Sequence, residues 1–268
     1  MPIGDYYSLV SGNRLVSLIH KLLGTPDLHT QIKFKPVIKF IKKYLNSFSS
    51  SQLKILDLGC GMGIGAFEIE KAIKNKNIDL DYVGVDVSEY AICGAKRVLK
   101  EHQNIRRKIS FFQEDAGLFL KKNNNLKADI VLLLDIIEHV KNPQDLIAMS
   151  DKILLSNGLF VVSVPTPIYP KIFGRKTHIK VGHLVEGYSE SQLDGLFLKM
   201  NYQKVMREYN TGMPAIISCW LSYNIFSSEN KYFNFFKFLF LYPFKFLDFY
   251  NGPKVSTSLF AVYKKVSA

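Results

Sequence analysis

A short glycine-rich segment constrains this 268-residue chain more than any other part of its sequence. The apolar run of residues 55–58 contains one acid, Asp57, and leads into Gly59-Cys60-Gly61-Met62-Gly63, after which a helical pattern begins at Ile64. Glycine lets the backbone adopt positive φ angles and lets a ligand approach the main chain closely. A strand, a tight turn and a helix in this order are typical of the nucleotide-binding edge of an open α/β sheet.

Composition and charge fit one α/β domain with additions. Apolar residues make up 47% of the chain, which is enough for a core and too many for a disordered protein. The net charge of +12 is compatible with a solvated basic surface, an anionic membrane face or an acidic substrate. We expect no nucleic-acid partner, because the lysines are scattered and no helix-turn-helix, zinc or RNA-binding signature is present.

The cysteines and the chain start indicate a location inside the cell. Cys60, Cys93 and Cys219 form no CxxC pair and leave an odd count, which favours a reducing compartment. The first residues lack a basic region followed by an apolar core, so we expect no signal peptide. We also expect no spanning helix, since no run of 18 uncharged apolar residues occurs. The predicted location is the cytoplasm, with the inner face of a membrane as the alternative.

Strands alternate with helices along most of the chain, which predicts a largely parallel sheet with right-handed crossovers. Two helical patterns, over residues 12–23 and 34–45, precede the first strand. A later helix over 189–200 carries a capping box formed by Ser189 and Gln192. Expected strands cover 53–58, 82–85, 109–113, 130–134, 159–164, 202–209 and 258–263, and the remaining helices cover 64–74, 88–100, 117–121 and 143–155.

Asp57 distinguishes between two kinds of nucleotide. Gly61, Gly63 and Ala66 satisfy the G-x-G-x-x-A pattern of dinucleotide sites, but this match is weak on its own. Asp86, at the end of the second strand, could accept both ribose hydroxyls of either nucleotide. A carboxylate at Asp57 would repel a pyrophosphate and attract an ammonium group. S-adenosylmethionine carries an ammonium group and no phosphate, so it is the favoured ligand.

An acid also follows the third strand. Asp115 could accept the adenine amino group, while the backbone N–H of Ala116 could meet a ring nitrogen. The alternative role for Asp115 is a helix N-cap, and the two roles are compatible.

Five segments, taken together, resemble the class I S-adenosylmethionine-dependent methyltransferases. Within that family they are similar to the small-molecule group that includes the quinone-biosynthesis O- and C-methyltransferases. The resemblance covers residues 53–209, and Ser156-Asn157-Gly158 departs from the usual Pro-Gly-Gly turn. It implies a Rossmann-like fold with a seven-stranded, mostly parallel sheet, an antiparallel last strand and helices on both faces. The segments are residues 57–63, 83–88, 115–116, 129–140 and 155–165.

The same resemblance implies a cofactor site and no metal. Glu138 and His139 have a second interpretation, as residues that support the loop around them. The family pattern places Asp57, Gly59, Gly61 and Gly63 around the methionine part, Asp86 at the ribose, Asp115 and Ala116 at the adenine, and Leu134 and Asp135 beside the sulfonium, with Cys60, Val87 and His139 as further cofactor contacts.

The methyl acceptor is expected under the loop of residues 165–188. Methyl transfer is an in-line displacement, and a base is needed only when the nucleophile carries a proton. We predict His183 as the acceptor contact or base, with His178 as a second candidate; the alternative is a hydrogen bond that fixes the loop. Candidate substrate contacts are Tyr169, Arg175 and Tyr188, whose alternative roles are packing on the sheet rim for the tyrosines and solvent exposure for Arg175.

The predicted reaction is methyl transfer from S-adenosylmethionine to an oxygen nucleophile on a small molecule or on a lipid- or nucleotide-linked glycan. The glycan hypothesis comes from residues 182–188, 169–174 and 27–36, which together resemble methyltransferases of glycan and cell-surface polysaccharide biosynthesis. Methylation of a quinone precursor, on carbon or oxygen, is the alternative. Two other classes stay open. One is a NAD-dependent oxidoreductase or epimerase, which would need a Tyr-x-x-x-Lys pair on a helix after the fourth strand, and we find none there. The other is a non-catalytic cofactor-binding scaffold.

Residues 213–256 form an aromatic-rich insertion. Asn234, Lys237, Lys245 and Asp248 fall near one helical stripe, and Pro243 should kink any helix. Residues 231–250 could contact a membrane surface, form a homodimer interface or cap the domain. The predicted organisation is a helical cap (1–50), an S-adenosylmethionine-binding domain (51–212 with 257–268) and the insertion (213–256).

Overall fold

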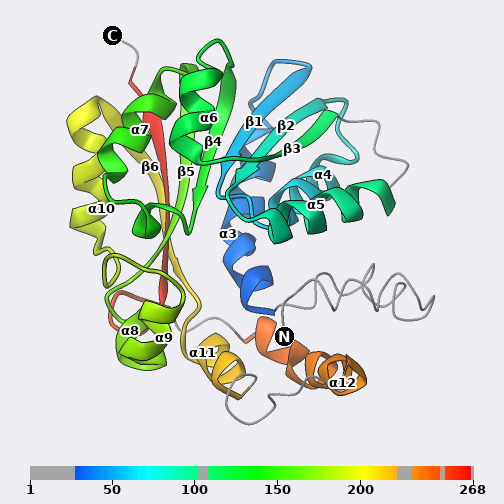
Figure 1. Cartoon of the computed structure of the whole chain (residues 1–268), viewed down its shortest axis with the longest axis vertical. Helices are drawn as coiled ribbons and strands as arrows, with labels where there is room; N and C mark the ends of the chain where they lie inside the picture. The colour runs from blue at the N-terminus through cyan, green and yellow to red at the C-terminus, as the bar shows by residue number, and fades with distance from the viewer. Residues whose placement is uncertain (1–27, 102–107, 222–230, 248–250, 267–268) are drawn as a thin grey trace.

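A computed structural model describes residues 28–101, 108–221, 231–247 and 251–266 of the chain (Figure 1). The predicted helix over residues 12–23 and the last three residues of the 231–250 segment lie outside the described residues. Within the described part, no helix combines the length and the apolar character needed to cross a membrane.

A seven-stranded sheet forms the centre of the fold, in the order β3-β2-β1-β4-β5-β7-β6. β7 is antiparallel to both of its neighbours, and every other pair is parallel. The predicted fold class, with its antiparallel last strand, is therefore confirmed. The strands are β1 Gln52–Leu58, β2 Asp79–Asp86, β3 Lys108–Gln113, β4 Ala128–Leu134, β5 Leu154–Pro165, β6 Tyr202–Asn210 and β7 Ser258–Lys265.

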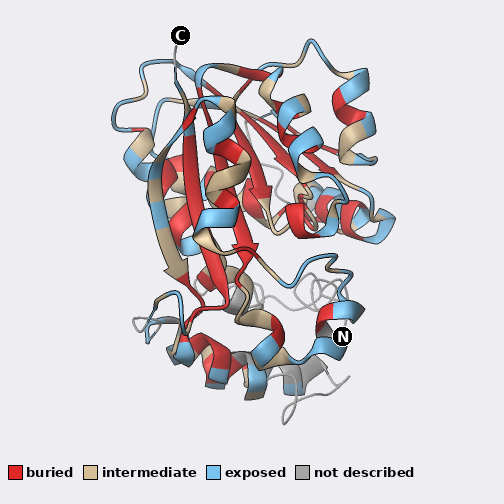
Figure 2. Ribbon diagram, turned by 90° about the vertical axis from the view of Figure 1, so that its left-hand side faces the viewer, coloured by how far each residue is buried: buried red, intermediate tan, exposed pale blue. Residues whose placement is uncertain are grey.

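Helices cover both faces of the sheet, because the strands carry apolar side chains on both faces and each face must be shielded from water. One core lies between the sheet and α6 Ala116–Lys122, α7 Pro143–Asp151 and α10 Glu190–Phe197. The other lies between the sheet and α3 Leu28–Tyr44, α4 Ile64–Ile73 and α5 Glu89–Glu101. Figure 2 shows the buried residues concentrated along the strands, with exposed residues on the outer surfaces of the helices.

Two local predictions have clear outcomes. The capping box of α10 is present, because Ser189 accepts from the backbone of Gln192 and the Gln192 side chain accepts from the backbone of Ser189. The predicted helix over 143–155 is too long. α7 ends at Asp151, since Leu154 already pairs with Ala128 at the start of β5.

In the described part of the chain, helices α8 Tyr169–Phe173, α9 Arg175–Lys180, α11 Met213–Trp220 and α12 Lys231–Leu241 and the 3-10 helix η4 Tyr242–Lys245 lie at one end of the sheet, where β4, β5 and β6 finish (Figure 1). α8 and α9 follow β5, and α10 begins only after this loop has returned to the sheet. α11 follows β6, and α12 with η4 leads back to β7. α3 contacts α11 and η4, so α3 and the insertion meet at this end.

The loop after β5 is attached to the sheet at defined points. The backbone N–H of Tyr188 donates to the carbonyl of Pro165 at 2.8 Å, and that of Leu184 donates to the carbonyl of Glu138 at 2.8 Å. Gly187 has a φ of +120°, and a Cβ there would lie 2.5 Å from the backbone of Thr166. These contacts hold the segment with His183 against the ends of β4 and β5.

Candidate functional site

The glycine loop between β1 and α4 has an unusual backbone that only glycine adopts easily. Gly59, Gly61 and Gly63 all have positive φ angles, of 75°, 52° and 73°. A Cβ on Gly63 would lie 2.5 Å from the buried ring of Phe111, so the helix start packs tightly against β3. A Cβ on Gly61 would meet nothing within 4 Å. The loop is therefore closed toward the sheet at Gly63 and open at Gly61.

Asp86 holds this loop from the end of β2. One carboxylate oxygen accepts from the backbone N–H of Gly61 at 2.9 Å, and the other accepts from that of Ser88 at 2.8 Å. Each carboxylate oxygen has more than one acceptor position, so Asp86 keeps capacity for further donors. The adjacent Val87 side chain is exposed.

Asp57 is the most strongly perturbed acid of the loop region. It is buried at the end of β1, where one of its oxygens accepts from the Tyr82 hydroxyl. Its other oxygen, Oδ1, is also buried and has no hydrogen-bond partner among the described residues. Burial, and secondarily the charge of Asp86, raises the pKa of Asp57 to about 7, although the Tyr82 hydrogen bond acts in the opposite direction. A buried, half-satisfied carboxylate of this kind favours a cationic partner.

Asp115 and Ala116 lie at the start of α6. The Asp115 side chain caps the helix, since Oδ1 accepts from the backbone N–H of Leu118 at 3.0 Å. Asp115 itself is exposed, and Ala116 is half-buried as the first residue of α6. The capping role predicted as an alternative is thus present, and it leaves one carboxylate oxygen available.

An ion pair that the sequence did not suggest connects α3 to the end of β4. Lys33 Nζ lies 2.6 Å from Asp135 Oδ2, although the two residues are 102 positions apart. Asp135 has a φ of 54° and follows Leu134, the last residue of β4. Burial alone would lower the pKa of Lys33, but the Asp135 charge and hydrogen bond outweigh it and raise this pKa.

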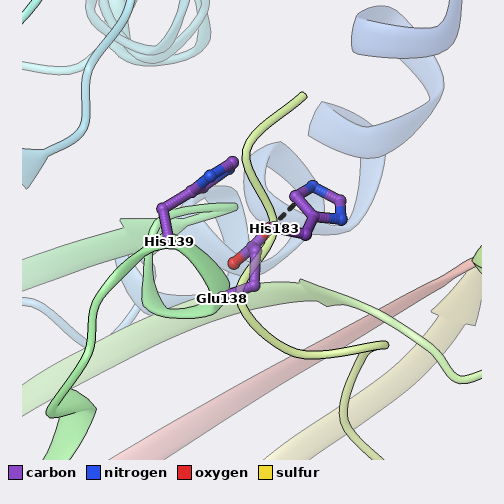
Figure 3. A group of neighbouring side chains, drawn as sticks. All are labelled: Glu138, His139 and His183. Carbon is purple, nitrogen blue, oxygen red and sulfur yellow. Dashed lines mark ion pairs between the residues drawn. The ribbon is translucent and has the colours of Figure 1, made fainter. Parts of the chain in front are cut away.

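Glu138, His139 and His183 form a second cluster at the same end of the sheet (Figure 3). Glu138 and His139 belong to the 3-10 helix η1 Ile137–His139, which follows β4. His183 comes from the loop after β5, and its Nε2 lies 4.0 Å from Glu138 Oε1. The rings of His139 and His183 meet edge to face with centroids 4.8 Å apart. The structure therefore brings together residues from two loops that are more than 40 positions apart.

Further contacts set the electrostatics of this cluster. Nδ1 of His183 lies 3.1 Å from Nδ1 of the buried His178, and Nδ1 of His139 lies 3.0 Å from the carbonyl oxygen of Gly182. Burial, followed by the neighbouring His139 and His178, lowers the pKa of His183 to about 4. Burial and the Asp135 carboxylate raise the pKa of Glu138 well above its ordinary value.

The three predicted substrate contacts occupy different environments. Tyr169 lies beside His183, with ring centroids 5.3 Å apart. Tyr188 is buried in the core, and its hydroxyl is 3.4 Å from the carbonyl oxygen of Ile137. Arg175 forms an exposed ion pair with Glu186 at 2.9 Å. Only Tyr169 of these three contacts the histidine cluster directly, and the positions of the other two match their alternative roles.

Comparison with known proteins adds a family and a set of relatives. A family model described as "Methyltransferase domain" matches residues 49–219. The chain is similar to the ubiquinone biosynthesis O-methyltransferase of Pasteurella multocida, with 27% identity over 143 residues that cover 48% of this chain and 55% of that protein. The chain thus spans about half the length of the curated relatives it matches.

Solved structures share the fold at low sequence identity. The magnesium protoporphyrin IX methyltransferase of Synechocystis PCC 6803, solved with bound SAH, has 12% identity and a TM-score of 0.54, with 98% of this chain and 94% of that chain covered. The plantazolicin methyltransferase BpumL, solved with a substrate analogue and SAH, has 19% identity and a TM-score of 0.54, with 99% and 96% covered.

The burial of Asp57 predicts an unusual pH dependence of stability. Because the folded state binds the Asp57 proton more tightly than the unfolded state, stability falls as the pH rises from about 4 to about 7. We expect this carboxyl group to lower the free energy of unfolding by roughly 2–3 kcal/mol between pH 5 and pH 8. In the Asp57→Asn variant that contribution should disappear. Urea unfolding at both pH values measures the difference, with Asp79→Asn, an exposed acid on β2, as the control. Equal pH dependence in all three proteins would contradict the assignment.

Proposed function

This chain belongs to the class I S-adenosylmethionine-dependent methyltransferases, and we propose that it transfers the donor's methyl group to a hydroxyl oxygen of a small molecule. Membership rests on the family model, which matches well over half of the chain, and on the shared sheet order. The sequence-based family prediction is confirmed. The acceptor atom, the acceptor and the roles of individual residues are our proposals.

The buried, unpaired oxygen of Asp57 is the observation that carries the proposed cofactor site. An ammonium group beside Asp57 Oδ1 would satisfy an atom that no described residue satisfies. The open space over Gly61 leaves room for a ligand against the main chain, and Asp86 at its side keeps acceptor positions for ribose hydroxyls. When bound, S-adenosylmethionine supplies a methyl group from its sulfonium, and the sulfur leaves as a neutral thioether. The chain's own task is then to bind, align and exclude water.

We place the acceptor beside the cluster of Glu138, His139 and His183, because this cluster lies at the same end of the sheet as the proposed cofactor site. Leu134 is the last residue of β4, which lies next to β1, and Asp135 follows it, so these two residues would border the sulfonium. His183 and Tyr169 face the same end of the sheet from the loop after β5. We propose that they contact the acceptor, with His178 behind His183 as its hydrogen-bond partner.

An oxygen nucleophile agrees with the similarity to ubiquinone biosynthesis O-methyltransferases such as that of Pasteurella multocida. These relatives favour a quinone precursor, whereas residues 182–188 favour a glycan acceptor. Incubation with labelled S-adenosylmethionine and each acceptor class separates the two. A chain that binds NAD and not S-adenosylhomocysteine would contradict the whole proposal.

Asp86 gives the most direct test of the cofactor proposal. We expect Asp86→Asn to weaken S-adenosylhomocysteine binding at least about tenfold, because the ribose loses a charged acceptor. The control is Asp81→Asn on the same strand. The Asp81 carboxylate lies away from the glycine loop and pairs with Lys108 Nζ at 3.1 Å. Titration calorimetry measures both affinities. A thermal scan checks that the Asp86→Asn substitution, which alters a contact with the glycine loop, has not unfolded the domain. Equal affinity for the two variants would remove Asp86 from the site.

We also propose that α12 contacts an anionic lipid surface. Phe238 and Leu241 face inward and form a small core with neighbours from α11 and η4. On the other side, Phe236 is 66% exposed and Phe240 is 64% exposed, one helical turn apart. Large exposed aromatic surface at the end of the molecule that holds the candidate site suits an acceptor carried by a membrane.

The lipid proposal predicts a loss of vesicle binding in the variant Phe236→Ser/Phe240→Ser. Flotation with phosphatidylglycerol vesicles should recover the intact chain and several-fold less of the variant, because each buried ring contributes roughly 1.5–3 kcal/mol. Leu118→Ser, which removes an exposed apolar side chain from α6, is the control. If flotation is unchanged and gel filtration instead shows that the variant dissociates a dimer, the surface is a homodimer interface.

A further inference from the structure

Glu138 is an exceptional carboxylate in this structure. It is 1% exposed, and neither of its oxygens has a hydrogen-bond partner in the described part of the chain. An unpaired buried carboxylate is expensive to keep, so such a group usually pairs with a cation or a metal ion. The neighbouring ammonium of Lys33 is already paired with Asp135. Within the described residues, Glu138 therefore lacks both a hydrogen-bond donor and an ammonium group of its own.

Two imidazoles flank this carboxylate. Figure 3 shows His139 and His183 on either side of the Glu138 side chain, which rises from η1 between them. One ligand atom from each of the three residues lies within 4.8 Å of the others. Ligand atoms around an ion such as Zn²⁺, bound at about 2.0–2.2 Å, lie roughly 3–3.5 Å apart. The widest spacing must therefore shorten by about 1.3–1.8 Å, and the exposed side chain of His139 can move toward the other two residues.

Hydrogen bonds behind the imidazoles prepare them as ligands. Nδ1 of His139 lies 3.0 Å from the Gly182 carbonyl oxygen, which can only accept, so Nδ1 carries the proton and Nε2 keeps its lone pair. Nδ1 of His183 is engaged by His178 at 3.1 Å, while its Nε2 is the atom that faces Glu138. An outer hydrogen bond that fixes the ring and its tautomer is the usual arrangement around metal-ligating histidines.

We propose that Glu138, His139 and His183 bind a divalent transition-metal ion of the Zn²⁺ class. Two imidazoles and one carboxylate suit such an ion better than Mg²⁺ or Ca²⁺, which prefer oxygen ligands. Three protein ligands leave a coordination position open. This proposal departs from the sequence-based expectation that no metal is bound.

The metal site has a role in the reaction, and this part of the inference rests on the proposed function. An acceptor hydroxyl at the open position would lose its proton to water more readily, because a bound divalent ion stabilises the oxyanion. The oxygen then forms a bond to the methyl carbon while the carbon–sulfur bond breaks. The products are a methyl ether, S-adenosylhomocysteine and one proton.

Zn²⁺ titration of the full chain, after treatment with EDTA, tests the proposal. Calorimetry should show one site per chain that Glu138→Gln weakens at least tenfold. The matched control is Glu186→Gln, which alters an exposed carboxylate in the loop after β5 and should leave the affinity unchanged. His139→Asn provides a second variant at an exposed position, so its fold is retained if Glu138→Gln fails to fold. Absence of binding by the unaltered chain, or equal affinity in His139→Asn, would overturn the proposal.

A parallel titration with S-adenosylhomocysteine in EDTA separates this inference from the proposed function. Retained nucleoside binding with no Zn²⁺ site would refute only the metal. Loss of nucleoside binding in the metal-free chain, restored by Zn²⁺ but not by Mg²⁺, would make the two sites interdependent and support the metal. Failure to bind S-adenosylhomocysteine under any condition would instead refute the proposed function, while the Zn²⁺ affinity would still stand on its own.

Discussion

The buried carboxylate of Asp57 is the constraint around which this end of the molecule is organised. Burying it with one oxygen unpaired costs about 4 kcal/mol at neutral pH, as its pKa of about 7 indicates. That cost is a large fraction of the stability of an ordinary domain. Strand β1 ends there, Tyr82 supports one side, and the glycine loop turns above it. A costly group that the rest of the structure maintains points to a ligand that satisfies it.

The sheet topology explains why the functional candidates converge. β1 and β4 are adjacent parallel strands, so the glycine loop and η1 begin at the same edge. β7 runs antiparallel between β5 and β6, which brings the long loop after β5 and the insertion after β6 to that edge as well. α3 closes the arrangement through Lys33 and Asp135. The fold itself thus places the glycine loop, with Asp57 and Asp86, and the cluster of Glu138, His139 and His183 at the same edge.

Local sequence signals were sufficient for the individual strands, the glycine loop and the α10 capping box, because each depends on residues a few positions apart. The seven-stranded sheet with its antiparallel last strand was predicted from the family resemblance. Contacts between distant residues were not predictable. No local pattern links Lys33 to Asp135, and the sequence does not reveal that Glu138 lacks a hydrogen-bond partner, since this depends on everything packed around it. Likewise, α7 ends early because Leu154 is recruited by β4, a tertiary contact that overrides helical periodicity. The cluster of Glu138, His139 and His183 was not predictable for the same reason, because it joins residues from two loops.

A crystal structure of the chain with S-adenosylhomocysteine tests the central claim most directly. The account predicts the amino group of the ligand within hydrogen-bonding reach of Asp57 Oδ1, either directly or through one water, and the ribose hydroxyls on Asp86. A nucleoside bound elsewhere, or an unliganded Asp57 Oδ1 beside a fully occupied cleft, would contradict it.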